Sequence, residues 1–395
     1  MILYSINEKI VKFIIKLTNK IKNRYFVYIY EKRVHKTIYN FYKKNYKKRA
    51  ALIYSPVSFI FHKNHKWYLR DTLYERNRIV AEILNSNNYI VDIYEWTINN
   101  YENKFNYDLV IDHGNLHKKI CDSQKINPFI ISFLATSYYE FNNNAEIKRI
   151  NNFIERNQIN TLPKRQLNKM NLDLCDVILL HGNKETKNTY PDKFHRKIHT
   201  IPNYPFSFLI SDIKKKYDDK IKKTFLYFGS SLGQIHKGLD LLIEVFLELK
   251  NLNLYICGKF EKEEELKKIY LDKIMKSDNI FLTGWILPNS DMYKEIISKS
   301  GFVILPSCSE GIAGGVINCM ASGLIPVVSK NSGIDIEKTG YLINDSIKDI
   351  KKQLNEIIKV ECYELELQSE EAIRQVSNMK KNFKEIIAKH IKTVN

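Results

Sequence analysis

The chain has 395 residues, enough for two domains that each bury a hydrophobic core, and its 44% hydrophobic content is ordinary for a soluble globular protein. The net charge is +18, but residues 1–50 alone hold 14 Lys or Arg against two acidic residues, so the excess is terminal and argues against a nucleic-acid partner. The six cysteines are scattered without a Cys-x-x-Cys pair, which argues against a disulfide framework or a zinc site and indicates a reducing compartment.

The first segment of the chain has the spacing of an amphipathic helix. Apolar residues recur at positions 3, 6, 10, 13, 14 and 17, and lysines stand at 9, 12, 16 and 20. The lysines leave no apolar run long enough for a signal peptide or a membrane-spanning helix. We expect residues 1–48 to be a basic helical extension that lies on an anionic membrane surface, which makes the protein cytoplasmic and peripheral at the inner face of the plasma membrane. Packing on the first domain and contact with RNA are the alternatives.

Strands and helices alternate through residues 49–205, which we expect to form the first domain. Apolar runs that end in turn residues predict strands, and periodic apolar positions predict helices. The predicted strands are 50–54, 89–94, 107–112, 128–133 and 176–180, and the predicted helical regions are 71–85 and 143–172. This alternation is typical of a parallel sheet with helices on both faces.

The same alternation returns over residues 224–360, after a charged linker at 206–223. The predicted strands here are 225–228, 252–257, 279–285, 302–306, 324–329 and 341–343, and the predicted helices are 239–249, 290–300 and 346–358. A last helix is expected over 363–391, inside a terminal segment 361–395. The sequence therefore predicts an α/β protein with two similar halves.

The segment from Ser307 to Ser329 is the most informative part of the chain. A buried strand precedes it, a small Gly-rich turn carries Glu310, and a helix opens near Gly314 or Gly315. Such a helix N-terminus presents unpaired N–H groups and a positive dipole, so it favours anions. Glycines let a ligand approach the backbone closely.

This segment resembles retaining glycosyltransferases of the GT-B fold, in the large glycogen-synthase-like family 4, the glycosyl transferases of group 1. That family carries a Glu, seven residues, a second Glu, and then a small-residue helix and a Gly-x-Pro-Val-Val strand. Glu310 matches the first acid, and Ala321 to Val328 is similar to the continuation, but Asn318 stands where the family has its second acid. The resemblance implies two Rossmann-like domains that face a central cleft, with the terminal helix crossing back to the first.

The resemblance also implies where a nucleotide-sugar donor would bind. A Gly/Ser-rich turn after the strand at 225–228 leads to Lys237 at a helix start, which suits a diphosphate. Leu232 stands where the family usually has an Arg, five residues before this lysine. The expected donor-binding residues are Lys237, Gly229, Ser230, Ser231, Gly284, Trp285, Ala313, Gly314, Gly315 and Asn318. A surface lysine, a core tryptophan and a helix residue that points at the neighbouring strand are the plain alternatives for Lys237, Trp285 and Asn318.

The first domain offers fewer candidates. The resemblance implies Glu310 and His113 as the catalytic residues, the acid because a nearby carboxylate stabilises an oxocarbenium-like state and the histidine because family members often place a histidine near the donor sugar from this domain. A helix-capping acid and a structural histidine are the alternatives. Tyr138 stands where the resembling subgroup has a histidine, and with Glu146 and Arg149 it is the expected acceptor-binding set. A solvated helix face is the default interpretation of the last two.

We therefore expect a retaining glycosyltransferase that moves a sugar from a nucleoside-diphosphate donor to a glycan or lipid-linked acceptor in surface polysaccharide synthesis. No cofactor and no metal are expected, because helix dipoles and Lys237 can supply the positive charge. A sugar-nucleotide epimerase of the same fold is the enzymatic alternative. A catalytically degenerate sugar-nucleotide-binding or scaffold protein is the other, since Leu232, Asn318 and Tyr138 depart from the family pattern.

Overall fold

A computed structural model describes residues 37–61, 68, 71–98, 101–102, 104–212, 214–229, 232–336 and 339–394. The basic helix predicted near the start of the chain, within residues 1–48, lies almost entirely outside these residues. Among the described residues of that range, Ile38 forms an isolated antiparallel bridge with Ile93. The backbone N–H of Asn40 donates to Asp92 Oδ1 at 2.7 Å.

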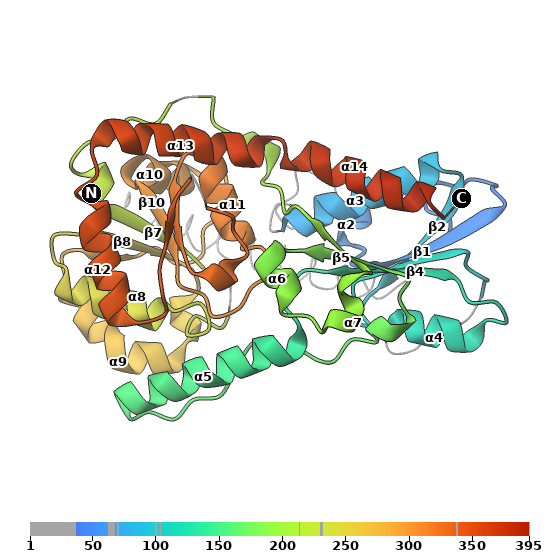
Figure 1. Ribbon diagram of the computed structural model, residues 1–395, viewed down its shortest axis with the longest axis horizontal. Helices are drawn as coiled ribbons and strands as arrows, with labels where there is room; N and C mark the ends of the chain where they lie inside the picture. Colours follow the sequence, from blue (N-terminus) through green and yellow to red (C-terminus); the bar gives the residue numbers. More distant parts are fainter. Residues whose placement is uncertain are drawn as a thin grey trace, which may run out of the picture. The chain divides into compact units, whose positions relative to one another are not determined.

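The chain is an α/β protein with two parallel six-stranded sheets (Figure 1). The strand order is β2-β1-β3-β4-β5-β6 in the first sheet and β12-β11-β10-β7-β8-β9 in the second. The strands of the first sheet are β1 (Lys48–Tyr54), β2 (Tyr89–Glu95), β3 (Leu109–Asp112), β4 (Phe129–Leu134), β5 (Val177–His181) and β6 (Ile198–Ile201). Those of the second are β7 (Thr224–Phe228), β8 (Asn253–Cys257), β9 (Ile280–Leu282), β10 (Phe302–Leu305), β11 (Ile325–Val328) and β12 (Tyr341–Leu342).

Helices connect the strands, as parallel pairing requires. Before β7 the α-helices are α2 (Val57–Ile60), α3 (Thr72–Ser86), α4 (Leu116–Ser123), α5 (Tyr139–Asn157), α6 (Lys184–Asn188) and α7 (Asp192–His195). After β7 they are α8 (Leu239–Glu248), α9 (Glu264–Met275), α10 (Asp291–Lys299), α11 (Gly314–Ala321), α12 (Ile347–Ile357), α13 (Cys362–Ser377) and α14 (Met379–Lys392).

The chain divides into two compact units, and the boundary falls between β3 and β4. One unit runs to Tyr68 and includes Leu73–Pro128, and the other contains Phe129–Asn395 with Leu69–Thr72. The predicted ranges of 49–205 and 224–360 describe the sequence pattern and stay predictions. The second unit begins earlier than the predicted second domain because α5 packs beside α8, where Arg156 forms ion pairs with Asp240 and Glu244 (Figure 1).

The first unit is built on β1, which pairs with β2 on one side and β3 on the other. All seven residues of β2 are buried, as expected for a parallel strand covered on both faces. A buried charge is compensated here, since Arg49 Nη1 bonds Asp92 Oδ2 at 2.7 Å and Tyr107 donates to the same oxygen at 2.9 Å. The carboxyl ends of these strands carry Tyr54, Glu95 and His113.

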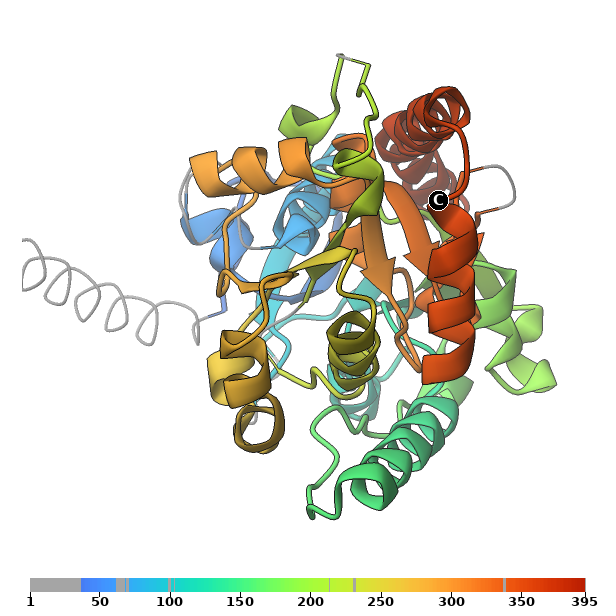
Figure 2. The same ribbon diagram turned by 90° about the vertical axis from the view of Figure 1, so that its left-hand side faces the viewer.

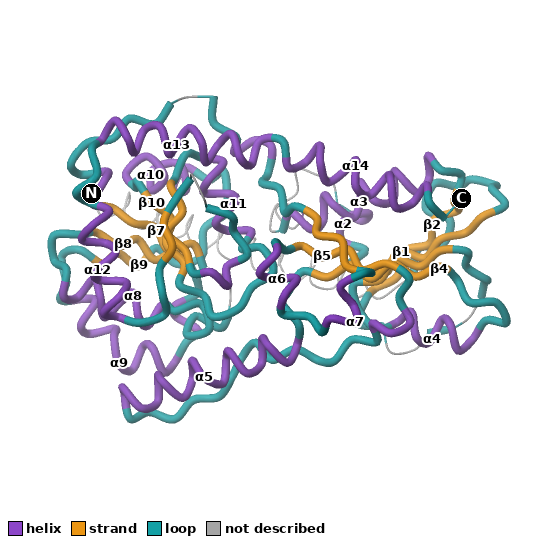
Figure 3. The backbone as a smooth tube through the Cα atoms, in the orientation of Figure 1, coloured by secondary structure: helices purple, strands orange, loops and turns teal. Residues whose placement is uncertain are grey.

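The second unit is organised around the second sheet, whose helices lie on both of its faces (Figures 2 and 3). The strands meet in an aromatic core, in which the Phe225 and Phe302 rings stack with centroids 4.8 Å apart. The helix starts are encoded locally. Ser290 and Ser346 cap α10 and α12 by accepting the N–H of Tyr293 and Asp349, at 3.2 and 3.1 Å.

The structure corrects two helix predictions. The helical region predicted over 143–172 ends at Asn157, where Gln158 adopts a left-handed conformation with φ of 54°, and residues 158–171 follow without regular structure. The predicted last helix is two helices, α13 and α14, which meet at Asn378. Phe383 of α14 lies against Phe133 of β4 and His181 of β5, with ring centroids 6.1 and 6.0 Å away.

Candidate donor-binding site

The predicted acid and the predicted lysine meet at the carboxyl edge of the second sheet. Glu310 follows β10, and Lys237 precedes α8 in the connection from β7, the strand next to β10. Lys237 Nζ forms an ion pair with Glu310 Oε1, and Ser307 Oγ donates to the same carboxylate oxygen at 2.9 Å. Ligands of open parallel sheets bind at this edge, so the pair lies where a donor would bind.

The pair is almost fully buried, and the neighbouring cations decide the charge of Glu310. Burial by itself raises the pKa of a carboxyl, but the charges of Lys237 and Arg165 and the hydrogen bond from Lys237 outweigh it. The pKa of Glu310 is lowered to about 2, so the group is an anion at neutral pH. A carboxylate of this kind accepts hydrogen bonds from sugar hydroxyls and stabilises nearby positive charge.

The loop that carries Glu310 is held by three side chains from earlier elements. Ser137 Oγ donates to the carbonyl of Glu310 at 2.6 Å and Thr186 Oγ1 to that of Gly311 at 3.0 Å. Asn203 Nδ2 donates to the carbonyl of Ile312 at 3.1 Å. Three successive carbonyls are thus fixed by donors that follow β4, β5 and β6, which positions the acid.

Glycine is required where this loop passes closest to other backbone. A Cβ atom on Gly311 would collide with the carbonyl oxygen of Ala135 and come within 2.6 Å of that of His181. Gly238, next to Lys237, has φ of +76°, and a Cβ there would lie 2.6 Å from Pro306 O. Both positions therefore favour glycine for steric reasons.

The predicted amide groups lie at the start of α11. The N–H of Ala313 is already used, since it donates to Ser332 O at 3.0 Å. Gly314 and Gly315 are the first two residues of the helix, and among the described residues their N–H groups make no hydrogen bond. These two amides are therefore available to an anion or a sugar oxygen beside Glu310.

The turn after β7 is partly described. Gly229 donates its N–H to Cys257 O at 2.7 Å, and a Cβ on it would come within 2.5 Å of the Tyr227 ring. Ser230 and Ser231 lie outside the described residues. Among those that follow, Gln234 Oε1 accepts the hydroxyl of Tyr227 at 2.6 Å, which holds the turn against β7.

Two of the predicted donor-binding residues differ in exposure, since Trp285 is exposed and Asn318 is buried. Trp285 is 38% exposed and follows Gly284, whose φ is +71°, so it is not a core aromatic. Contact with a nucleobase stays a prediction. Asn318 is buried in α11, and its Oδ1 accepts the N–H of Phe206 at 3.2 Å. The oxygen of Asn318 thus bonds the backbone at Phe206. The geometry gives no direct support to ribose binding by Asn318.

The predicted acceptor residues on α5 are not on a solvated face. Glu146 is 1% exposed and accepts the N–H groups of Lys164 and Arg165 at 3.0 and 2.8 Å. Arg149 is 2% exposed and donates to Pro306 O at 3.0 Å. The default interpretation of a solvated face is therefore wrong, and the burial of both side chains gives no support to acceptor binding.

The remaining first-half candidates lie at strand ends. Tyr138 directly precedes α5, its N–H donates to Thr189 Oγ1 at 3.0 Å, and its ring centroid lies 5.3 Å from that of Tyr190. His113 follows β3, and its ring centroid is 4.2 Å from that of Tyr54. Burial, and then the charge of Arg76, lower the pKa of His113 to about 3, so it is neutral at pH 7.

Sequence analysis missed three residues of the site. Ser307 bonds Glu310, and His236 is buried with its Nε2 2.7 Å from Ser309 O and its Nδ1 3.7 Å from Glu146 Oε1. Arg165 acts on Glu310 through its charge. Ser307 and His236 adjoin the predicted motifs and could have been included, whereas Arg165 stands in a segment that was predicted to be helical.

The described residues contain neither a cluster of metal-ligating side chains nor a membrane-spanning helix. No group of three His, Cys, Asp or Glu side chains within them could hold a metal ion, and no described helix is long and apolar enough to cross a membrane.

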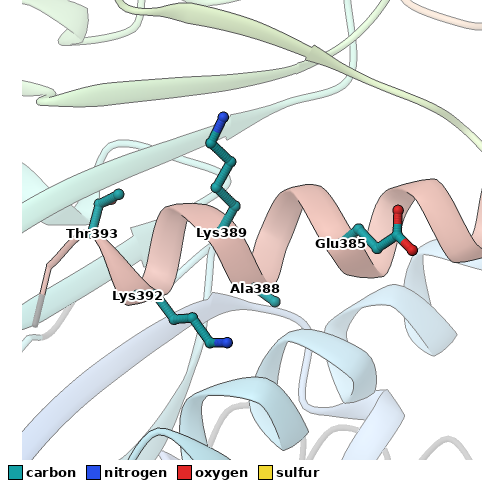
Figure 4. Close-up of a pocket in the computed structure, with 5 residues that line it drawn as sticks. All are labelled: Glu385, Ala388, Lys389, Lys392 and Thr393. Carbon is teal, nitrogen blue, oxygen red and sulfur yellow. The ribbon is translucent and has the colours of Figure 1, made fainter.

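A shallow pocket of about 530 Å³ lies on α14, lined by Glu385, Ala388, Lys389, Lys392 and Thr393 (Figure 4). Lys389 and Lys392 extend to different sides of that helix, so they do not converge on one ligand (Figure 4).

Residues 222–359 match the family described as Glycosyl transferases group 1, a range that contains both Lys237 and Glu310. No curated protein sequence matches the chain significantly.

Several solved structures share the fold. Sucrose-phosphate synthase from Thermosynechococcus elongatus is 13% identical with a TM-score of 0.58, over 88% of this chain and 98% of its own. HepE of Anabaena in complex with UDP is 12% identical with a TM-score of 0.56, over 88% of this chain and 100% of its own. A point mutant of TarM from S. aureus, in complex with fondaparinux, alpha-GlcNAc-glycerol and UDP, is 16% identical with a TM-score of 0.51.

The alignment with TarM covers 72% of this chain and 55% of the TarM chain, so this chain spans about half of that protein. These likenesses establish the architecture, and the family match establishes which half carries the recognisable motif. The chain is a GT-B protein whose residues 222–359 match the group 1 glycosyl transferases.

Proposed function

We propose that this chain is a glycosyltransferase that uses a nucleoside-diphosphate sugar as its donor. The observation that carries the proposal is the buried pair of Lys237 and Glu310 beside the unbonded N–H groups of Gly314 and Gly315. It combines a cation and helix amides, which suit a diphosphate, with an ionised acid, which suits a sugar. The family match and the UDP named in the HepE and TarM complexes support the same substrate class.

In this proposal the bond between the anomeric carbon and the β-phosphate oxygen breaks, and its electrons leave on the diphosphate. Lys237 and the α11 amides stabilise that negative charge. Glu310 holds donor-sugar hydroxyls and stabilises the positive charge that develops on the ring. The oxygen of an acceptor hydroxyl then forms the new bond to the anomeric carbon, and its proton passes to the departing diphosphate. His113 stays a predicted catalytic residue, and because it is neutral at pH 7 its predicted role is that of a hydrogen-bonding group.

Three finer points rest on the family resemblance and the sequence. We propose retention of configuration, a glycan or lipid-linked acceptor in surface polysaccharide synthesis, and attachment to the inner face of the plasma membrane through residues 1–48. We also propose that no metal is needed, because Lys237 and the helix amides supply positive charge where the diphosphate leaves.

The test is slow hydrolysis of nucleotide sugars by the full chain without acceptor, measured as UDP or GDP release across a donor panel, with and without a chelator. We expect turnover that the chelator leaves unchanged. Lys237→Ala is expected to lower the rate about 100-fold, because it removes one stabilising group from the leaving diphosphate, and Glu310→Gln is expected to lower it as well.

The control is Lys351→Ala, which removes an exposed lysine that pairs with Glu248 on α8, away from the site, and should leave the rate unchanged. Binding without turnover for every donor and acceptor would favour a degenerate binding protein. Inversion at C2 or C4 of the donor sugar, without release of nucleotide, would identify an epimerase instead.

A further inference from the structure

The segment that follows α5 presents one arginine toward the donor site. Its backbone is fixed, because the N–H of Arg165 donates to Glu146 Oε1 and Oε2 at 2.8 and 3.1 Å. The neighbouring Gln166 also bonds Glu146 Oε2, through Nε2, at 2.8 Å. Glu146 is buried, so the segment is anchored at this point and the position of Arg165 is determined.

The side chain of Arg165 runs across the loop that carries Lys237. A Cβ atom on Gly233 would lie 2.5 Å from both Cγ and Cδ of Arg165, so glycine leaves the space that the arginine stem uses. Gly233 is itself held, since its N–H donates to Glu263 Oε1 at 2.8 Å. Its carbonyl accepts the N–H of Lys237 at 3.2 Å, which places the arginine stem one turn from that lysine.

Three other cations of this region each have a partner among the described residues. Arg149 bonds Pro306 O, Arg156 pairs with Asp240 and Glu244, and Lys164 Nζ bonds Glu263 Oε2 at 2.7 Å. The guanidinium of Arg165 makes no hydrogen bond or ion pair with any residue in the described part of the chain. An anchored arginine with an unpaired guanidinium is suited to bind an anion.

The charge of Arg165 acts electrostatically on Lys237 and Glu310. Burial and then Arg165 lower the pKa of Lys237 against the opposing charge of Glu310, and Arg165 contributes to the lowered pKa of Glu310. Because Glu310 offsets Lys237, the pair by itself is close to neutral. Arg165 makes the summed charge of Lys237, Glu310 and Arg165 positive, which a bound anion would compensate.

We propose that Arg165 binds the diphosphate of the donor and supplies, with Lys237, the second cation of that subsite. This inference rests on the proposed function. It also explains how the subsite tolerates Leu232, an exposed apolar residue on the same loop, since the second positive charge comes from the segment after α5. The planar guanidinium can bond two phosphate oxygens at once, which suits a diphosphate.

The experiment is calorimetric titration of the full chain with UDP, GDP and the corresponding nucleosides. For the nucleoside diphosphate that the wild type prefers, Arg165→Gln should weaken binding about 10- to 100-fold, as expected for the loss of charge-assisted hydrogen bonds. The affinity for the nucleoside alone should not change. The affinity of Arg165→Lys for the nucleoside diphosphate should fall between those of the wild type and Arg165→Gln, because lysine keeps the charge and loses the planar geometry.

Two controls separate a contact from a general effect. Lys148→Gln removes one exposed positive charge from α5 and should leave UDP binding unchanged. Leu232→Arg, added to Arg165→Gln, should restore at least part of the lost affinity, because residue 232 is 48% exposed on the loop that carries Lys237.

Three outcomes are decisive against the proposal or its basis. Equal UDP affinity in the wild type and in Arg165→Gln overturns it. Parallel losses for nucleoside and nucleoside diphosphate show a structural effect and also overturn it. If the wild type binds no nucleoside diphosphate, the proposed function itself fails and the inference fails with it.

Discussion

Burial disfavours the charged form of both predicted catalytic residues, but their neighbouring charges lead to opposite outcomes. Glu310 has a cation within bonding distance, so its pKa falls to about 2 and its charge is kept. For His113, burial and the charge of Arg76 both disfavour the protonated form, and they lower its pKa to about 3. The first is therefore suited to stabilise positive charge, whereas the second is suited only to neutral hydrogen bonding at pH 7.

The depressed pKa of His113 predicts a loss of stability in acid. Between pH 6.5 and 3 the unfolded chain binds a proton at this histidine that the folded chain does not bind, so stability falls as pH is lowered through that range. His113→Gln removes this effect. Thermal unfolding at pH 7 and pH 5 should show that the wild type loses about 1 to 2 kcal/mol more than the variant. An equal acid dependence in both proteins would show that His113 is already protonated in the folded state.

At the scale of the element, α5 is a charged connector between the ends of the first sheet and the helices of the second. Arg156 forms ion pairs with Asp240 and Glu244 of α8, and Asp240 is fully buried. Burial raises the pKa of Asp240 against the influence of Arg149 and Arg156, so its charge depends on these arginines. Ion pairs therefore hold α5 against α8, and separating a buried pair of charges costs free energy.

Loss of the ion pair between Arg156 and Asp240 should destabilise the folded protein because a buried charge loses its partner. Arg156→Gln leaves Asp240 buried without its main partner and is expected to lower the free energy of unfolding by about 2 to 3 kcal/mol in urea titrations. Adding Asp240→Asn should recover much of this loss, because the uncompensated charge disappears. Lys351→Gln breaks an exposed pair with Glu248 and should cost about 0.5 kcal/mol or less. Similar losses for Arg156→Gln and Lys351→Gln would refute the role given to α5.

For the whole molecule, the distribution of charge matters more than its total. Residues 1–50 hold 14 of the 62 Lys and Arg and only two acidic residues. A basic segment at one end attracts an anionic surface without making the catalytic halves basic. This separation fits the membrane attachment that we propose for residues 1–48.

Deletion of residues 1–24 tests that arrangement, since it removes six Lys or Arg and one Glu. In flotation with phosphatidylglycerol vesicles, the full chain should float and the shortened chain should bind at least about 100-fold more weakly, at roughly 1 kcal/mol for each basic residue near the surface. Neither protein should float with phosphatidylcholine alone. Equal flotation of both proteins with anionic vesicles would place the attachment elsewhere.

The alternation of apolar runs with helical periodicity is local information, and it determined the two parallel sheets and most of their strands. The spacing around Glu310 and the lysine at the start of α8 likewise indicated the donor site, because glycine turns and helix starts are encoded by neighbouring residues. The joint between α13 and α14 was not predicted, since the apolar spacing continues across Asn378 with no glycine or proline to mark the break.

Only the tertiary structure decided which polar side chains are available to bind a ligand. Glu146 and Arg149 have the sequence pattern of a solvated helix face, and packing against the second half of the chain buries both. Asn318 is used by Phe206, and Arg165, which no motif marks, is brought over Gly233 by a backbone anchored on Glu146. Burial and pairing depend on contacts between residues far apart in sequence, so neither periodicity nor spacing along the chain can show them.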